Sequence, residues 1–81
     1  MSELRQELGD AVRLLVDDRE AVEIDERDSP DGVHFEIRVA SGDLGKVIGR
    51  QGRTIRALRS LLEARGGKDG VRYWVDIHED E

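Results

Sequence analysis

Residues 45–55 read Gly-Lys-Val-Ile-Gly-Arg-Gln-Gly-Arg-Thr-Ile and are the most informative part of the sequence. In it, Gly49 and Gly52 are separated by the polar pair Arg50 and Gln51, with apolar residues on either side. A glycine has no Cβ, so the chain can turn tightly at both positions and expose its backbone N–H groups. The spacing predicts a tight loop between two short amphipathic helices. The N-terminus of the second helix then faces the loop, where its N–H groups and its dipole favour a phosphate.

The remaining elements follow from the spacing of the apolar residues, which is helical in some segments and alternates as in strands in others. In chain order, the predicted elements are a helix over 3–17, strands over 21–25 and 33–39, a helical turn over 44–48, a helix over 53–65 and a strand over 71–77. A turn at 28–32 is expected to join the first two strands as a hairpin, and Gly66 with Gly67 to end the second helix. The order helix–strand–strand–helix–helix–strand predicts an α+β domain with the helices on one face of a three-stranded sheet.

Length and charge narrow the class of protein. A chain of 81 residues fits one domain, so residues 1–81 are expected to form a single unit. The net charge is −6, but residues 43–65 carry +4 and the rest of the chain −10. One positive segment on an acidic body can confine a polyanion to one surface.

The sequence also excludes several classes. There is no cysteine, so disulfides and Cys-ligated zinc are impossible. The charged N-terminus lacks the apolar core of a signal peptide, and no stretch approaches the length of a membrane span. We therefore expect a cytoplasmic protein that does not contact a membrane.

The segment from Val47 to Ile55 closely resembles the KH motif, Val-Ile-Gly-x-x-Gly-x-x-Ile. The helix and strand before it, over about 3–27, resemble the type II arrangement of KH domains, and the KH core is then expected over about 33–78. The run Gly-Arg-Gln-Gly-Arg-Thr-Ile-Arg-Ala-Leu-Arg and the short chain are similar to the small bacterial KhpA proteins. The resemblance implies a type II-like KH domain that binds single-stranded RNA, with the loop clamping the backbone of about four nucleotides.

The resemblance, together with the local residue types, indicates which residues would contact RNA. Basic and amide side chains would contact phosphates. The apolar residues beside the loop are expected to belong first to the core and to line only part of a groove for unstacked bases. The predicted RNA-binding residues are Lys46, Val47, Ile48, Gly49, Arg50, Gln51, Gly52, Arg53, Ile55 and Arg56. Members of the family are implied to be RNA chaperones or post-transcriptional regulators, linked to cell elongation and envelope homeostasis. They self-associate or pair with a KH protein of the KhpB (Jag) type, so a homodimer or such a complex is expected here.

Two alternatives to RNA contact remain open. Arg53, Arg56 and Arg59 recur every three residues and would equally suit a solvated helix face, with Arg59 and Glu63 as an ordinary i,i+4 pair. Of these, Arg59 is the one expected to lie on the surface without contacting RNA. The domain as a whole could instead be a protein-interaction module that docks another KH protein and has only weak RNA affinity of its own.

Catalytic and metal chemistry is not indicated. No nucleophile lies near a base in the predicted fold, and no two carboxylates are forced into a cleft. His34 and His78 are isolated in strand register, without a third ligand in view. We expect no enzymatic activity, no small-molecule substrate, no cofactor and no metal site.

Trp74 is the one large aromatic residue that does not face the predicted core. In the alternation of the last strand it falls opposite Tyr73 and Val75, so it is expected on the open face of the sheet. If the third strand pairs with the second, Trp74 lies near His34 and Arg38. There it would either anchor an interface with a second domain or lie flat beneath arginine side chains of its own chain.

Overall fold

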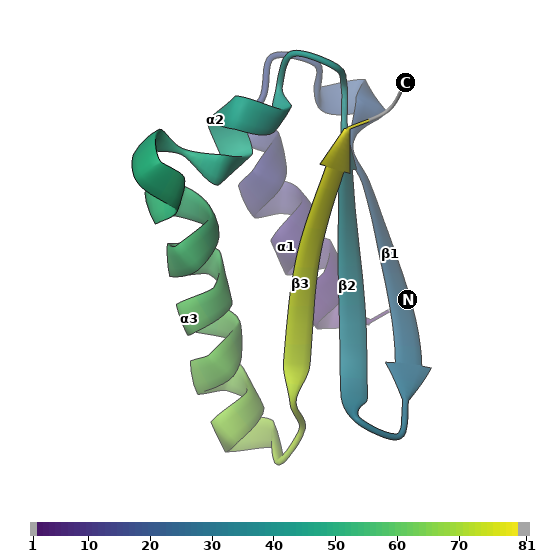
Figure 1. Ribbon diagram of the computed structural model, residues 1–81. Coiled ribbons are helices and arrows are strands. Elements are labelled where there is room, and N and C mark those ends of the chain that lie inside the picture. The colour runs from purple at the N-terminus through teal and green to yellow at the C-terminus, as the bar shows by residue number, and fades with distance from the viewer. Residues whose placement is uncertain (1, 80–81) are drawn as a thin grey trace.

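The computed structural model describes residues 2–79 and shows helices packed against a three-stranded sheet (Figure 1). In chain order the elements are α1 (Glu3–Arg13), η1 (Arg19–Ala21), β1 (Glu23–Ser29), β2 (Gly32–Val39), α2 (Leu44–Ile48), η2 (Arg50–Gly52), α3 (Arg53–Asp69) and β3 (Tyr73–Glu79). The predicted α+β class and the predicted order of helices and strands are both confirmed. The layout is the one that a type II KH domain implies.

The sheet has the strand order β1-β2-β3. β1 and β2 form the predicted hairpin, antiparallel from the pair Glu23 and Arg38 to the pair Ser29 and Gly32. β3 lies parallel to β2, with Trp74 opposite His34. A parallel neighbour needs a crossover connection, and here α2, η2 and α3 supply it. The loop at Gly49 therefore lies within the crossover, away from the strands.

One hydrophobic core joins the helices to the sheet. Phe35, Ile37 and Val39 alternate along β2 and are buried, while the residues between them face the opposite side. The helical residues Leu8, Val12, Ile55 and Leu62 and the β3 residue Val75 pack in the same core. The helices thus cover one face of the sheet, and the other face is left to solvent.

The N-terminal helix is shorter than predicted. The apolar spacing suggested a helix over 3–17, but α1 ends at Arg13 and its last turn tightens, with Leu14 N–H donating to the Ala11 carbonyl. Leaving the helix lets Val16 enter the core. It also brings the N–H of Asp18 to the carboxylate of Asp43 at 3.0 Å. Tertiary contacts therefore override the helical period over the last predicted turn.

The first and third strands also differ from the predicted ranges. β1 begins at Glu23 and runs to Ser29, through charged residues whose sequence does not alternate clearly. Its extent is set by pairing along the whole of β2, and the turn shrinks to the two residues Pro30 and Asp31. β3 is shifted two residues later than predicted, to Tyr73–Glu79, because it pairs with β2 up to Val39.

The long helix continues past the glycines that were expected to end it. Gly66 and Gly67 lie inside α3, and Gly70 ends the helix with a left-handed backbone at φ 71°. Gly66 is buried because the next segment returns directly against it: Val71 N–H donates to the Gly66 carbonyl at 3.0 Å. The close approach of the Val71 backbone therefore explains why residue 66 is a glycine. The residue that caps the helix is Gly70.

Candidate nucleic-acid interface

The loop between α2 and α3 has an unusual backbone at three of its four residues. Gly49 has φ 77°, Gln51 has φ 56° and Gly52 has φ 72°. Gln51 is the only non-glycine residue with positive φ in the part of the chain that the structure describes. A left-handed conformation costs a residue with a Cβ about 1–2 kcal/mol, and such strain is found mostly at functional sites.

The two glycines of the loop are required for different reasons. A Cβ at Gly49 would lie 2.2 Å from Oγ1 of Thr54, so the side chain of Thr54 closes over this position. A Cβ at Gly52 would meet only the guanidinium of Arg56, at 3.4 Å. Gly49 is therefore fixed by packing inside the domain, whereas Gly52 leaves open space toward solvent and the Arg56 side chain.

The N-terminus of α3 is open to a ligand. Gly52, the capping residue, has no side chain to accept the first N–H groups of this 17-residue helix. By contrast, the Ser2 side chain caps α1 by accepting from Arg5 N–H at 3.0 Å. The Arg53 N–H donates to the Arg50 carbonyl, but no side chain caps the N–H groups that follow it. These groups and the positive dipole end of α3 lie at the loop, which is an arrangement that binds phosphates.

The positive charge at the loop is concentrated in three arginines. Arg50, Arg53 and Arg56 are exposed, and none of them forms an ion pair with any residue between 2 and 79. Arg65, further along α3, is paired with Glu7 at 3.4 Å and Asp69 at 3.2 Å. The field of these carboxylates, Asp69 first, raises the pKa of Arg65. Arg53 and Arg56, the α3 arginines nearest the loop, therefore keep a charge that no described carboxylate compensates, whereas Arg65 does not.

Lys46 is placed differently from what the sequence suggested. Its ammonium group lies 3.1 Å from a carboxylate oxygen of Asp17 and 3.2 Å from one of Asp43. Hydrogen bonds to these two carboxylates, that to Asp17 first, raise the pKa of Lys46 above its usual 10.5. Its charge is therefore already compensated within the protein, and it ties the segment before β1 to α2.

The apolar residues predicted beside the loop divide into core and surface. Val47 is fully buried and Ile55 nearly so, because both belong to the core under the sheet. Ile48 is half-buried and is the one that can offer apolar surface beside the loop. A groove floor made of all three side chains is therefore not what the structure presents.

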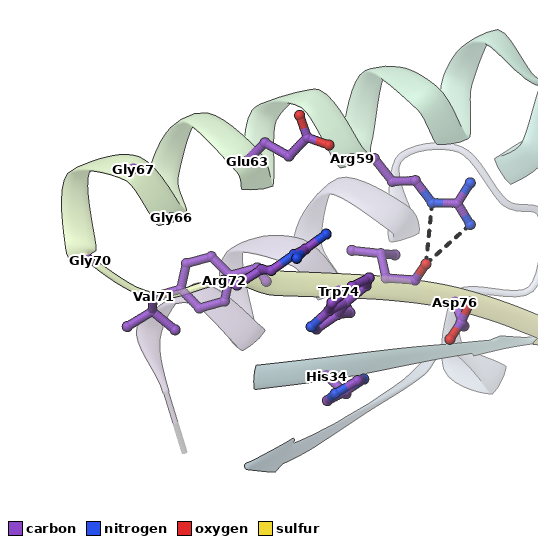
Figure 2. Close-up of a pocket in the computed structure, with 12 residues that line it drawn as sticks. His34, Arg59, Glu63, Gly66, Gly67, Gly70, Val71, Arg72, Trp74 and Asp76 are labelled. Atoms are coloured by element: carbon purple, nitrogen blue, oxygen red, sulfur yellow. Dashed lines mark hydrogen bonds between the residues drawn. The ribbon is translucent and has the colours of Figure 1, made fainter. Parts of the chain in front are cut away.

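A cavity of about 750 Å³ runs between α3 and the free edge of β3 (Figure 2). At one end of it, Arg59 reaches from α3 and donates Nε–H and Nη2–H to the main-chain carbonyl of Val75, at 3.3 and 3.1 Å. The sequence suggested a surface residue paired with Glu63. It could not show that a carbonyl of the edge strand would lie within reach, because that contact depends on the parallel pairing of β3 with β2.

Trp74 lies on the open face of the sheet, as expected, and is covered by its own chain. Its ring stacks on His34 with 5.7 Å between centroids and 8° between planes. The guanidinium carbon of Arg72 lies 4.0 Å from the centroid of the indole. Arg38, the other predicted neighbour, is paired instead with Glu23 and Asp25 of β1. The second placement considered for Trp74, flat beneath an arginine, is the one observed.

Metal and membrane sites find no support in residues 2–79. No three His, Asp or Glu side chains of this range come together as they would around a metal ion. None of its helices combines the length and the apolar character needed to cross a bilayer.

Comparison with known proteins gives a consistent set of relatives. A sequence model of the family described as "KhpA/KhpB, KH domain" matches residues 5–77. The RNA-binding protein KhpA of Aquifex aeolicus is 42% identical over 79 residues, which cover 98% of this chain and all of the relative. The RNA-binding protein KhpA of Chlamydia trachomatis is 38% identical over 77 residues, covering 95% and 99% of the two chains. That of Leifsonia xyli is 45% identical over 69 residues, covering 85% and 88%.

Proposed function

Because this chain belongs to the KhpA/KhpB family of KH domains, we propose that it binds single-stranded RNA through the loop Gly49–Gly52. The sequence indicated this same family. The expectation that the chain is not an enzyme agrees with it, since the relatives are named as RNA-binding proteins. The observation that carries the proposal is the open N-terminus of α3, directly after a strained glycine loop and flanked by unpaired arginines. Such a site holds a phosphate by backbone N–H groups, dipole and charge together.

The proposed path of the RNA starts at the loop. Phosphates lie against the first turn of α3, which no side chain caps, with Arg50 and Arg56 on either side. The bases then turn toward the free edge of β3, into the cavity where Arg59 donates to the Val75 carbonyl. Ile48 supplies apolar surface beside the loop. Lys46 contributes little to RNA contact, because two carboxylates already compensate its charge.

The proposed role is that of a cytoplasmic RNA chaperone or post-transcriptional regulator that affects cell elongation and the envelope. Contacts in a groove of this kind are few, since the bound strand covers about four nucleotides. A second domain, from another copy or from a KhpB-type protein, would lengthen the bound strand and raise the affinity through effective concentration. The acidic remainder of the chain would keep RNA away from the other surfaces.

The alternative function is docking of a partner protein with only weak RNA binding. The observation that favours it is a hollow between α1 and α3 that is lined mostly by apolar residues, among them Leu4, Leu58 and the exposed Leu61. The two functions are separable, because this hollow and the loop lie on different parts of the surface.

The loop is tested by the double substitution Arg50→Asp and Gln51→Asp. It places two negative charges where a phosphate would lie and leaves the glycines and the core unchanged, so RNA binding should be lost while the melting temperature stays nearly the same. Binding is measured by fluorescence anisotropy with a labelled single-stranded octanucleotide.

The matched control is Arg19→Asp with Gln6→Asp, which changes the net charge equally on exposed residues outside the loop. The control should bind RNA almost as well as the unmodified protein. Equal affinity of the loop variant and the unmodified protein would remove the loop from the RNA site. Full partner docking by a loop variant that no longer binds RNA would favour the alternative function.

A further inference from the structure

Arg72, Trp74 and His34 form a stacked column that neither the loop nor the core requires. Figure 2 shows Trp74 between the other two, with Arg72 on the side nearer α3. Both faces of the indole are therefore occupied, and direct stacking of a ligand on Trp74 is blocked. The column presents the outer face of the Arg72 guanidinium to the cavity, and the indole of Trp74 supports the guanidinium on its other face.

The charge of Arg72 is available to a ligand. The residue is exposed and has no ion pair with any described side chain. An unrestrained arginine side chain loses much rotamer freedom when it binds, but contact with the indole already orders this one. A guanidinium plane is a surface on which unpaired bases stack in RNA complexes.

The opposite wall of the cavity leaves room for a flat group. Gly66, Gly67 and Gly70 line this end, and a Cβ at Gly67 or Gly70 would meet nothing within 4 Å. The same cavity also includes Arg59, whose guanidinium bridges α3 to the Val75 carbonyl, so a strand coming from the loop passes over this side chain before it reaches the glycines.

The carboxylates along the cavity favour a base over a phosphate. The carboxylates of Glu63 and Asp76 line the same cavity and would repel a phosphate, whereas they can accept hydrogen bonds from the N–H groups of a base. The column also includes a polar group without a partner, since Nε1 of Trp74 is enclosed and unbonded. A buried N–H without a partner lowers the stability of the fold. Proteins tolerate such a cost mostly at residues that contribute to a functional site.

We propose that the outer face of Arg72, supported by Trp74 and His34, is a stacking site for one nucleobase beyond those held next to the loop. The inference rests on the proposed function, since the strand reaches this site from the loop. The site is tolerant of base identity, because every base has a flat face. It extends the bound strand toward the C-terminal end of α3.

The closing experiment compares Arg72→Lys with the unmodified protein on two RNAs, a tetranucleotide and an octanucleotide. Lysine keeps the positive charge and can still cover the indole with its methylene chain, but it lacks the flat guanidinium. The variant should bind the octanucleotide about fivefold more weakly than the unmodified protein, and the tetranucleotide equally well. The octanucleotide can bind in more registers than the tetranucleotide, which raises its apparent affinity. This gain in affinity is the same for both proteins and cancels when the two proteins are compared.

A second readout uses the indole N–H signal of Trp74, the only tryptophan in the chain, in NMR spectra. The octanucleotide should shift this signal, while the tetranucleotide should shift amides at the loop and near Arg59 and leave the indole signal in place. The proposal is overturned if Arg72→Lys weakens both RNAs equally or neither, or if the indole signal stays fixed when the octanucleotide binds.

Two further outcomes locate the failure. If neither RNA shifts the loop amides, the proposed function fails and the stacking site with it. If the indole signal shifts with protein concentration in the absence of RNA, the column contacts a second copy of the chain, and the stacking site is wrong while the loop remains.

Discussion

The ammonium nitrogen of Lys46 lies 3.2 Å from Oδ1 of Asp43, a carboxylate enclosed at the junction of two helical segments. The other oxygen of Asp43 accepts the N–H of Asp18 at 3.0 Å. These contacts join the chain after α1 to the start of α2. They also distinguish Lys46 from Arg50, Arg53 and Arg56, which form no ion pair among the described residues.

Replacing Lys46 should therefore affect stability more than RNA binding. Lys46→Met leaves Asp43 without its cation, and we expect a lower urea midpoint for unfolding. Arg53→Met, a matched loss of one charge at the exposed start of α3, should weaken RNA binding instead. It should also make the slope of log K against log[salt] shallower by about 0.7, the value for one phosphate contact. An equal change of slope in Lys46→Met would show that Lys46 contacts the RNA backbone.

Asp43 should make the domain sensitive to acid. The hydrogen bond from the Asp18 N–H, more than any other contact, holds the pKa of Asp43 below its usual 3.8. The unfolded chain therefore takes up this proton at a higher pH than the folded chain does. The stabilisation is present above pH 3.8 and is lost as the pH falls through the lower pKa of the folded state.

Urea unfolding of the wild type and Asp43→Asn across the acid range measures this dependence. The asparagine variant should be less stable at neutral pH, and the difference between the two proteins should shrink below pH 3.8. A constant difference at every pH would mean that the charge of Asp43 does not contribute.

The two loop glycines should tolerate alanine unequally. Gly49→Ala combines an unfavourable φ with a clash against Thr54, so we expect a loss of about 2–4 kcal/mol in unfolding free energy. Gly52→Ala has the unfavourable φ without the clash and should lose about 1–2 kcal/mol. Denaturant titration of both variants measures these free energies of unfolding. Equal losses in the two variants would mean that contact with Thr54 is not the reason why residue 49 must be a glycine.

A second pair of glycines should respond in opposite directions. A Cβ at Gly66 would lie 2.3 Å from the Val71 carbonyl oxygen, so Gly66→Ala should cost about 1–3 kcal/mol. Gly67, its neighbour in α3, faces open space, and Gly67→Ala should gain about 0.5–1 kcal/mol from helix propensity. Thermal melting of the two variants should move the midpoint down and up respectively. A shift in the same direction for both would contradict the packing described for Gly66.

The elements that the sequence predicted well are those whose periodicity is set by a single buried face. β2 alternates cleanly through Phe35 and Ile37, and the hairpin and the loop at Gly49 follow from local turn chemistry. The limits of α1 and β1 were less predictable, because they depend on where Val16 and the residues opposite β2 are buried.

The geometry of the candidate site was predictable in its loop and less so in its surroundings. The spacing of Gly49 and Gly52 and the neighbouring arginines stand in the sequence itself. The pairing of Lys46 with Asp17 and the reach of Arg59 to Val75 join residues far apart in the chain, and no local pattern encodes them. The stacking of Trp74 between Arg72 and His34 likewise requires the parallel register of β2 and β3.

The two outer strands of the sheet are both unsuited to adding a further strand. β1 carries five charged residues among its seven, and unlike a flat apolar edge it gives an incoming strand little to pair against. On the other side, the Val75 carbonyl of β3 already accepts from Arg59. Growth of the sheet from one molecule to the next is thus disfavoured at either margin. Edge-to-edge aggregation of the folded domain is therefore expected to be slow even at high concentration.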